Sequence, residues 1–565
     1  METRRCILSA LIIFIVFSSM PLQAFDEPAD LILYNGKIIT VNSRDLVTEA
    51  IAVKDDKITK VGSNREIKPL AGPQCKLIDL RGRTVTPGLV DSHYHVIYYG
   101  MQFWPGFVNI RMPAVQSKSD LLHIVGDKAK QLKKGEWISA NQGFHIKPEE
   151  TLDRSDLDKV APDNPAYLRH GSGQYAVVNT AALKIAGIDR NTPDPVSSKI
   201  MHDRNGDPNG VLSHYPAENM VAKHAPGYGD RTEADIFASI DRGQELCLQA
   251  GYTSVQDVII SNPRDIQAYV KFADTGKLKI RLTMMLYVHS EEQAKQYLQM
   301  VKGFKSDNVV FGGWKLAMDG GPGGGTMLMY DKKMPGAKFA YPYFSQETFN
   351  RIVKLLHDTG LQVAVHVGGD QGIDMTLTSF EEALKASPRK DPRHRIEHCL
   401  FPSKEALARM KKSNIIFSTS PQWITWHGDI YKWATNEKTM QDFIPLKTAL
   451  RMGIPVAFGC DVPASIYQEP KWAFAGAVMR RSKGGPLNEA ERLTIQEALR
   501  VHTLGSAYAG FAEETTGSLE PGKLADMVVW NHDLYHLTRD QIMQLQPELT
   551  IVGGKVVYEK VKTGG

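Results

Sequence analysis

Apolar runs of strand length alternate with helix-like stretches through the middle of the chain. This alternation predicts a parallel sheet covered by helices, because each parallel strand needs a long crossover to reach the next. Eight runs qualify, and they begin at Thr84, Tyr252, Lys279, Val309, Leu361, His394, Ile415 and Ile454. Eight such strands predict an α/β fold, a (β/α)8 TIM-like barrel.

The two ends of the chain carry a different pattern, short strands broken by glycine- and aspartate-containing turns. This texture runs from Asp30 to Asp79 and returns from Ala525 onward, which predicts one small β-sandwich domain built from both chain ends. We place this domain at residues 25–84 plus 515–565 and the barrel at residues 85–514. The stretch from about residue 98 to residue 250 is far longer than one crossover helix, so it predicts an insertion that caps the barrel.

The first 24 residues have the pattern of a cleaved secretory signal. Arg4 and Arg5 precede an apolar stretch from Ile7 to Phe17, and small or neutral residues follow at 22–24. The apolar stretch is shorter than the roughly twenty residues that a membrane span needs. We expect an exported protein, periplasmic or secreted, with no stable membrane span after cleavage; the alternative is a retained N-terminal anchor.

Composition narrows the class of partner. The 67 Lys and Arg residues nearly balance 63 Asp and Glu residues, without long runs of one sign. A nucleic-acid-binding protein would show a basic patch or stripe, so we expect no nucleic-acid partner and a small-molecule substrate instead. The five cysteines have irregular spacing and predict no disulfide framework. Homo-oligomerisation is left open.

Side chains that can bind a metal follow the predicted barrel strands. They are His93, His95, Lys315, His366, His398 and Asp461. Active sites of such barrels are built at the C-terminal ends of the strands, and two histidines two apart on an extended chain face the same way. Each residue has an ordinary alternative: a hydrogen-bonded core histidine, a lysine that reaches solvent, or an aspartate that caps a helix. The shared position at the ends of different strands favours one site for a divalent metal.

Several longer strings carry a family resemblance. They are TVTPGLVDSHYH from Thr84, GGWKLAMDG from Gly312, AVHVGGDQGID from Ala364, RIEHCLF from Arg395, VAFGCDVPAS from Val456 and GSLEPGKLADMVV from Gly517. In this order they resemble the amidohydrolase superfamily, and more narrowly amidohydrolase family 3, which includes the N-substituted formamide deformylases. The resemblance extends from about residue 29 to residue 557.

The resemblance implies a role for each candidate residue. His93 and His95 would bind the more buried metal together with Asp461. His366 and His398 would bind a second metal, or would polarise the substrate if only one ion is present. Lys315 matches the position where the family can carry a carboxylated lysine, and a carbamate between two cations avoids the repulsion that an ammonium would suffer.

The expected chemistry is hydrolysis of a carbon–nitrogen bond of an amide, an N-formyl group or a cyclic amide, outside peptides. A bound divalent cation lowers the pKa of its water to about 7 and polarises the scissile carbonyl. Asp461 would accept the water proton and pass it to the leaving amine. One or two ions are expected, and zinc suits the nitrogen-rich ligand set best.

Two segments depart from the family pattern. After Lys315 the chain runs through a Gly-rich loop, Asp319–Thr326, which lacks the Lys-Ser or Lys-Thr pair of a phosphate-binding loop, so we interpret it as a βα loop near the metal. Gln174 stands where the family usually has a histidine near the substrate, which argues for an altered specificity or a weaker catalyst. His427 and Trp423 would form an apolar wall for the substrate, the alternative being simple packing on the barrel rim.

Two other kinds of function share this pattern. One is a catalytically inactive binding or regulatory protein that keeps the barrel. The other is a different metal-dependent reaction, such as an isomerase or a decarboxylase, because one fold supports many chemistries. A candidate residue at every ligand position of the resembled family argues against an inactive protein, and the hydrolase is the leading hypothesis.

Overall fold

The computed structural model describes residues 28–144, 150–302, 304, 306, 309–465 and 467–561. Its centre is an eight-stranded parallel sheet in the order β20-β19-β18-β17-β16-β15-β14-β8. The strands are β8 (Leu89–Tyr94), β14 (Tyr252–Ile260), β15 (Arg281–Tyr287), β16 (Val309–Ala317), β17 (Gln362–Val367), β18 (Arg395–His398), β19 (Ile416–Thr419) and β20 (Val456–Phe458). All eight predicted runs supply these strands, which confirms the TIM-like barrel.

Just beyond strand β20, the sheet closes onto β8 through backbone contacts. The backbone N–H of Asp461 donates to the carbonyl of His93 at 2.8 Å. The buried Asp91 of β8 accepts hydrogen bonds from the backbone N–H groups of His93 at 2.8 Å and Cys460 at 2.9 Å. This carboxylate therefore connects the first and last barrel strands where the candidate ligands stand.

Helices surround the barrel, as the alternating pattern predicts. Those between its strands are α7 (Glu233–Gln249), α8 (Pro263–Asp274), α9 (Glu291–Val301), α10 (Gln346–His357), α11 (Asp370–Ala386), α12 (Lys404–Lys412) and α16 (Leu446–Met452). Shorter helices near the site are α2 (Val96–Met101), α13 (Gln422–Trp426) and α14 (Gly428–Ala434), and α18 (Ile495–Arg500) follows the last strand. Their apolar faces join the strands in one large core.

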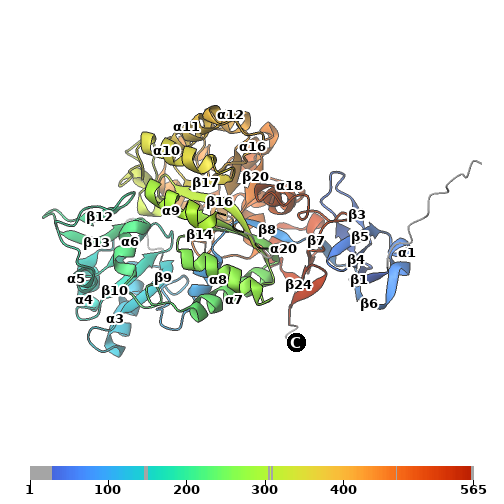
Figure 1. Cartoon of the computed structure of the whole chain (residues 1–565), viewed down its shortest axis with the longest axis horizontal. Coiled ribbons are helices and arrows are strands. Elements are labelled where there is room, and N and C mark those ends of the chain that lie inside the picture. The colour runs from blue at the N-terminus through green and yellow to red at the C-terminus, as the bar shows by residue number, and fades with distance from the viewer. Residues whose placement is uncertain are drawn as a thin grey trace, which may run out of the picture.

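The chain ends form two further sheets beside the barrel, in the β-sandwich region at the right of Figure 1. One has the order β5-β4-β1-β6 and the other β25-β24-β23-β7-β2-β3. Their strands are β1 (Ala29–Tyr34), β2 (Lys37–Ile39), β3 (Val47–Thr48), β4 (Ala50–Lys54), β5 (Lys57–Gly62), β6 (Ala71–Asp79), β7 (Thr84–Pro87), β23 (Met527–Trp530), β24 (Pro547–Val552) and β25 (Lys555–Glu559). A sandwich from both chain ends is thus confirmed.

The apolar run that begins at Thr84 was predicted as one strand, and the structure divides it between two sheets. Strand β7 pairs with β2 and β23, whereas β8 begins the barrel. The break falls at Gly88, where a Cβ atom would lie 2.1 Å from Oγ1 of Thr253. Only glycine lets the chain pass that close between the sheets.

The insertion forms a five-stranded sheet with its own helices, at the left of Figure 1. The strands are β9 (Ile138–Phe144), β10 (Ala166–His170), β11 (Tyr175–Val178), β12 (Lys199–His202) and β13 (Pro208–Ser213), and the helices are α3 (Lys118–Gln131), α4 (Arg154–Val160), α5 (Thr180–Ala186) and α6 (Tyr215–Ala222). Two small apolar cores lie within it. The insertion therefore has a fold of its own.

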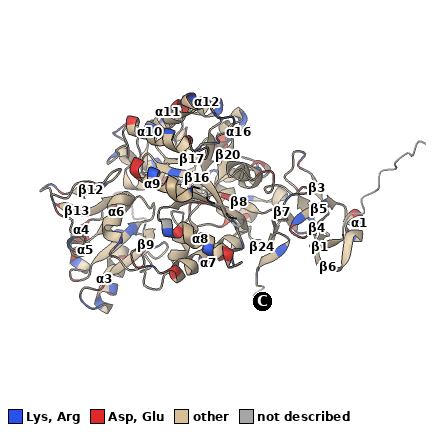
Figure 2. Ribbon diagram, viewed as in Figure 1, with Lys and Arg blue, Asp and Glu red and all other residues tan. Residues whose placement is uncertain are grey.

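Basic and acidic residues intermingle over all three regions (Figure 2). None of the helices in the described ranges is long and apolar enough to cross a membrane. The signal peptide predicted for residues 1–24 lies outside the described residues.

Candidate metal centre and active site

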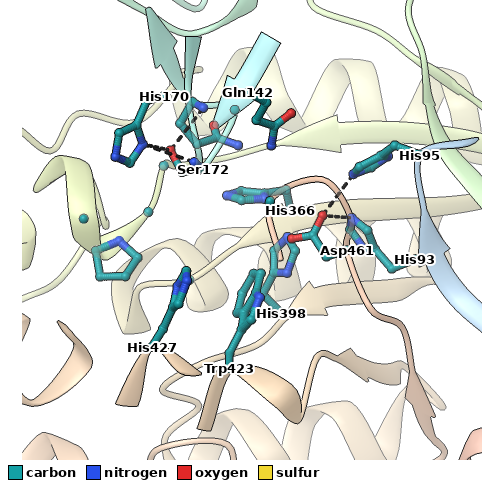
Figure 3. Close-up of a pocket in the computed structure, with 18 of the residues that line it drawn as sticks. His93, His95, Gln142, His170, Ser172, His366, His398, Trp423, His427 and Asp461 are labelled. Atoms are coloured by element: carbon teal, nitrogen blue, oxygen red, sulfur yellow. Dashed lines mark hydrogen bonds and ion pairs between the residues drawn. The ribbon is translucent and has the colours of Figure 1, made fainter. Parts of the chain in front are cut away.

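Two histidines and one aspartate converge where strands β8 and β20 end. Nε2 of His95 lies 3.0 Å from Oδ1 of Asp461, and Nε2 of His93 lies 3.5 Å from the same oxygen. All three side chains are buried, and their candidate ligand atoms lie within 4.8 Å of one another (Figure 3). Two imidazoles and a carboxylate at this spacing are a ligand set for a divalent transition metal.

The backbone at the end of the last strand is unusual. Asp461 has φ +52°, in the left-handed region that residues other than glycine rarely occupy. Its backbone N–H is held by His93, so the strained conformation is fixed between the two strands. Such strain persists where the surrounding structure imposes it, often at functional sites.

Three more predicted residues line the same pocket. Lys315 of β16 is 1% exposed, His366 is the last but one residue of β17, and His398 ends β18. The ring centroid of His398 lies 4.7 Å from that of His93 and 4.4 Å from that of His366. The three histidine rings therefore form a continuous row across the pocket.

Several buried nitrogen atoms of these residues lack partners. Nζ of Lys315, Nε2 of His366 and Nδ1 of His398 make no hydrogen bond to any described residue. Leaving buried polar atoms unpaired costs free energy, so such a cluster is expected where a bound group supplies the partners. Imidazole nitrogens with free lone pairs around carboxylates fit a divalent cation.

Burial and neighbouring charge keep the histidines neutral. Burial, followed by the Lys315 charge, lowers the pKa of His366 to about 3 and that of His93 well below its usual value. Burial also lowers the pKa of His398. Metal ligation needs the neutral form of imidazole, so the site keeps these residues in the binding form at neutral pH.

Lys315 is a buried lysine whose pKa is lowered from its usual value. Burial lowers its pKa to about 8, although the carboxylates of Glu397 and Asp461 pull it upward. A pKa of about 8 gives Lys315 a larger neutral fraction at neutral pH than an ordinary lysine has, and the neutral amine can react as a nucleophile. This state is the one that can take up carbon dioxide to form a carbamate.

Glu397 is a site residue that the sequence interpretation missed. Its Oε2 lies 2.6 Å from Nδ1 of His93 and accepts a hydrogen bond from Ser418 at 2.7 Å, while its Oε1 accepts from Nε of Arg395 at 2.6 Å. Burial raises the pKa of Glu397, but the charges of Arg395 and Lys315 and the Ser418 hydrogen bond together lower it. An ionised Glu397 holds the proton of His93 on Nδ1, which leaves Nε2 free to face Asp461.

The signal for Glu397 was present in the strand RIEH. A charged side chain in a fully buried strand almost always has a partner. The alternation of strand side chains places Glu397 and His398 on opposite faces. The structure departs from that alternation at His398, which has φ +71°: His398 lines the pocket, and the buried Glu397 contacts the candidate ligand His93.

The pocket has a strand side and an insertion side, and its empty volume of about 970 Å³ includes its open mouth. We define the strand side as the six predicted ligand residues at the barrel strand ends. We define the insertion side as the pocket-lining residues Gln142, Arg169, His170, Ser172, Gly173 and Gln174. His170 and Ser172 face the strand side across the pocket in Figure 3.

The predicted aromatic wall lies beside the candidate ligands. Trp423 stacks on His398 with ring centroids 4.9 Å apart and donates its indole N–H to Oγ of Ser465 at 2.6 Å. His427 also lines the pocket, with its ring 6.2 Å from that of Trp423. The wall therefore covers one face of His398 and presents an apolar surface to a substrate.

Gln174 and the Gly-rich loop both reach the pocket. Oε1 of Gln174 accepts a hydrogen bond from the Tyr343 hydroxyl at 3.2 Å. Residues 320–323 of the loop line the pocket rim, and the buried Asp319 fixes the loop by accepting from the backbone N–H groups of Gly368 and Gly369, both at 2.9 Å. The loop therefore lies near the candidate metal site, as the sequence interpretation expects.

A parallel barrel with histidines and an aspartate at its strand ends is the architecture of a metal-dependent hydrolase. The chain belongs to the amidohydrolase family, whose model matches residues 76–558. Family members are metal-dependent hydrolases, in agreement with the donor set described above.

Individual proteins are similar to almost the whole chain. It is 29% identical to the YtcJ protein of Bacillus subtilis strain 168, covering 94% of this chain and 99% of that protein. It is 26% identical to the N-substituted formamide deformylase of Arthrobacter pascens, covering 94% of this chain and 98% of that enzyme. A metal-dependent hydrolase of Pyrococcus horikoshii OT3 has a similar fold, with a TM-score of 0.70 at 23% identity over 90% of this chain and 99% of its own.

Proposed function

We propose that this chain is an exported amidohydrolase that cleaves a non-peptide carbon–nitrogen bond of an amide, an N-formyl group or a cyclic amide. The observation that carries the proposal is the convergence of His93, His95 and Asp461, with unpaired buried nitrogens of three further residues lining the same pocket. The similarity to a formamide deformylase supports the choice of bond.

His93, His95 and Asp461 would hold one divalent ion, and zinc suits this nitrogen-rich set. Lys315 as a carbamate, His366 and His398 would hold a second. The bound ion supplies Lewis acidity toward a carbonyl and a lowered pKa for water. Asp461 is the only group of the first set that can take a proton at an oxygen, and burial raises its pKa, which favours proton acceptance.

The protein's own residues would complete the reaction. Asp461 would take the proton of the attacking water at a carboxylate oxygen and deliver it to the leaving nitrogen. If only one ion binds, His366 and His398 would stand beside the substrate carbonyl, and a ring N–H of neutral His398 would donate a hydrogen bond to it. The buried setting strengthens these interactions because little water competes.

The pocket walls support a substrate with an apolar substituent. Trp423 and His427 form one wall, and Leu400, Ile430 and Tyr431 extend it. Gln174 on the insertion side would contact the polar end of the substrate. An aryl or alkyl group on the nitrogen of a formamide or amide matches this division.

The test uses the purified mature protein loaded with zinc. It is assayed for amine release from N-benzylformamide and N-benzylacetamide, and for ring opening of hydantoin. We expect turnover of at least one probe that stops when a chelator removes the metal and returns when zinc is restored. Metal bound without turnover of any amide would contradict the proposal and favour the inactive binding protein.

Export belongs to the same proposal, as do the domain limits, residues 25–84 plus 515–565 for the β-sandwich and 85–514 for the barrel. Cleavage after residue 24 predicts a mature N-terminus at Phe25 in the fraction outside the cytoplasm. N-terminal sequencing of that fraction checks both the cleavage and the location. A full-length chain in the membrane fraction would contradict the prediction.

A further inference from the structure

Tyr287 ends strand β15 and lies in the wall of the candidate active site. In the barrel sheet it pairs in register with Lys315 of the neighbouring strand β16. Side chains of residues in register point to the same face of a sheet, so Tyr287 stands beside Lys315 in the same pocket. The sequence interpretation gave Tyr287 no role.

The hydroxyl of Tyr287 is bonded to a buried histidine of the insertion. The Tyr287 oxygen lies 2.6 Å from Nε2 of His214, and Nδ1 of His214 lies 2.7 Å from the carbonyl oxygen of Ser197. A carbonyl oxygen can only accept, so Nδ1 of His214 carries the proton and donates it. For a neutral His214, Nε2 must then accept, and the Tyr287 hydroxyl must donate.

The structure supports a neutral, fixed His214. The residue is 2% exposed, and burial lowers its pKa to about 4. Its ring stacks on Tyr343 at 3.9 Å, and its backbone N–H donates to the carbonyl of Gln174 at 2.8 Å. With φ +71° the backbone adopts a conformation that is costly for histidine and is held by these contacts.

The ring of Tyr287 is held as firmly as its hydroxyl. His289 packs against it with ring centroids 4.3 Å apart, and Tyr215 stacks on His289 with ring centroids 4.8 Å apart. Only 5% of Tyr287 is exposed. Its oxygen therefore keeps one orientation, with its proton committed to His214 and its lone pairs as the remaining polar capacity.

We propose that Tyr287 is a specificity-determining residue that accepts a hydrogen bond from the N–H of the substrate. It would favour secondary amides and formamides, which carry an N–H, over esters and N,N-disubstituted amides, which do not. An ester oxygen in the same place would set lone pairs against lone pairs. His214 is the positioning residue, because its Nε2 accepts the hydrogen bond of the Tyr287 hydroxyl and so keeps that O–H directed away from the substrate. The inference rests on the proposed function and narrows its substrate class.

A matched pair of probes tests this selectivity. N-benzylformamide and benzyl formate differ by N–H against oxygen at the leaving group. Tyr287→Phe should lower kcat/KM for the formamide about tenfold, the scale of one buried hydrogen bond, and should leave or raise kcat/KM for the ester. Tyr215→Phe is the control, because it removes a hydroxyl from the same aromatic cluster without touching the pocket, and both rates should remain.

A second comparison does not depend on the ester. N-benzyl-N-methylformamide lacks the N–H, so its disadvantage relative to N-benzylformamide should be large in the native enzyme and should shrink about tenfold in Tyr287→Phe. This coupling between substrate group and side chain separates a direct contact from general damage to the site. His214→Gln should shift the formamide-to-ester ratio in the same direction.

The outcomes are distinct. If Tyr287→Phe leaves the formamide-to-ester ratio of kcat/KM unchanged, because both values fall equally or neither falls, the proposed role of Tyr287 is overturned and the proposed function stands. If the zinc-loaded native protein hydrolyses N-benzylacetamide or hydantoin but none of these three probes, the role of Tyr287 in formamide selection is overturned and the proposed function stands. Absence of hydrolysis of every amide, formamide and cyclic amide probe would overturn the proposed function and this inference with it.

Discussion

The strand side and the insertion side of the pocket are built by different means. The strand side takes its six residues from the end regions of five barrel strands, with His93 and His95 both at the end of β8, and the strand register fixes their spacing. The insertion side takes its residues from β9, β10 and the turn before β11, which belong to a separate sheet. Under the proposed function, the comparison teaches that the barrel would fix the chemistry, whereas the choice of substrate would depend on how the insertion sits over it.

Their polar atoms differ in the same way. On the strand side, buried nitrogens of Lys315, His366 and His398 have no partner among the described residues. On the insertion side, Gln142 donates to the carbonyl of Gly171 at 2.8 Å, and Arg169 donates to Glu218 at 2.7 Å. The strand side therefore has polar atoms that a bound group could pair, whereas polar side chains on the insertion side already pair with neighbouring residues.

The largest effect is expected on the strand side, at Asp461. Asp461→Asn removes the oxygen that would take the proton and weakens a ligand, so kcat should fall at least about 1000-fold. Circular dichroism should show the same fold. Asp163→Asn, at an exposed aspartate paired with Lys134, is the control. Activity within tenfold of the native enzyme would contradict the role of Asp461.

The next effect concerns the residue behind His93. Glu397→Gln keeps the shape of the side chain but removes the charge that holds the proton on Nδ1 of His93. Metal affinity should fall by about 10- to 100-fold, measured by competition with a chromogenic chelator. Ser418→Ala, which removes the hydroxyl donor to Glu397 and its contact with the Ser92 hydroxyl but keeps the Glu397 charge, should have a smaller effect. Unchanged affinity in Glu397→Gln would show that His93 does not depend on it.

His502 is a buried histidine that lines neither the strand side nor the insertion side of the pocket, so it shows how a buried histidine without a proposed role affects stability. Burial lowers the pKa of His502 to about 3, and its ring lies among Tyr252, Phe458 and Phe474. The unfolded chain takes up a proton below about pH 6.5, so the contribution of His502 to stability is complete above that pH and falls as the pH drops toward 3. Between pH 7 and pH 5 the loss is about 2 kcal/mol.

His502→Phe should remove that part of the acid sensitivity and leave metal content unchanged. Urea unfolding at pH 7 and pH 5 measures the difference in unfolding free energy. A variant as sensitive to acid as the native protein would contradict the assignment.

The smallest effect is expected on the insertion side. Gln174→His restores the residue type that the resembled family usually has there, next to Tyr343. We expect a change of a few-fold in the relative kcat/KM of two amide probes, on the scale of one hydrogen bond. Metal content should stay the same. A loss of metal in this variant would break the division between the two sides.

Much of the strand side could be predicted because a strand imposes a simple rule. The apolar runs located the eight strands, and His93, His95, His366, His398 and Asp461 stand at or next to their ends. Glu397 escaped because the positive φ of His398 breaks the alternation on which the rule depends. Local sequence carries no sign of that backbone change.

The insertion side could not be predicted in the same detail. The contact between Tyr287 and His214 joins residues 73 positions apart. Tyr287 ends the barrel strand β15, and His214 lies between β13 and α6 of the insertion. The existence of this contact depends on how the insertion packs on the barrel, which periodicity does not encode. The sequence did predict Gln174 near the pocket, through the family resemblance, but gave no sign of its partner Tyr343.

The most direct test of the account is a count of transition-metal atoms per chain in the native protein and in His93→Ala, by elemental mass spectrometry after loose ions are removed. We predict one or two atoms per native chain, two if Lys315 is carboxylated, and a loss of at least one in the variant. No metal in the native protein even after addition of zinc, or the same metal content in both proteins, would contradict the assignment of a metal centre to the barrel strand ends.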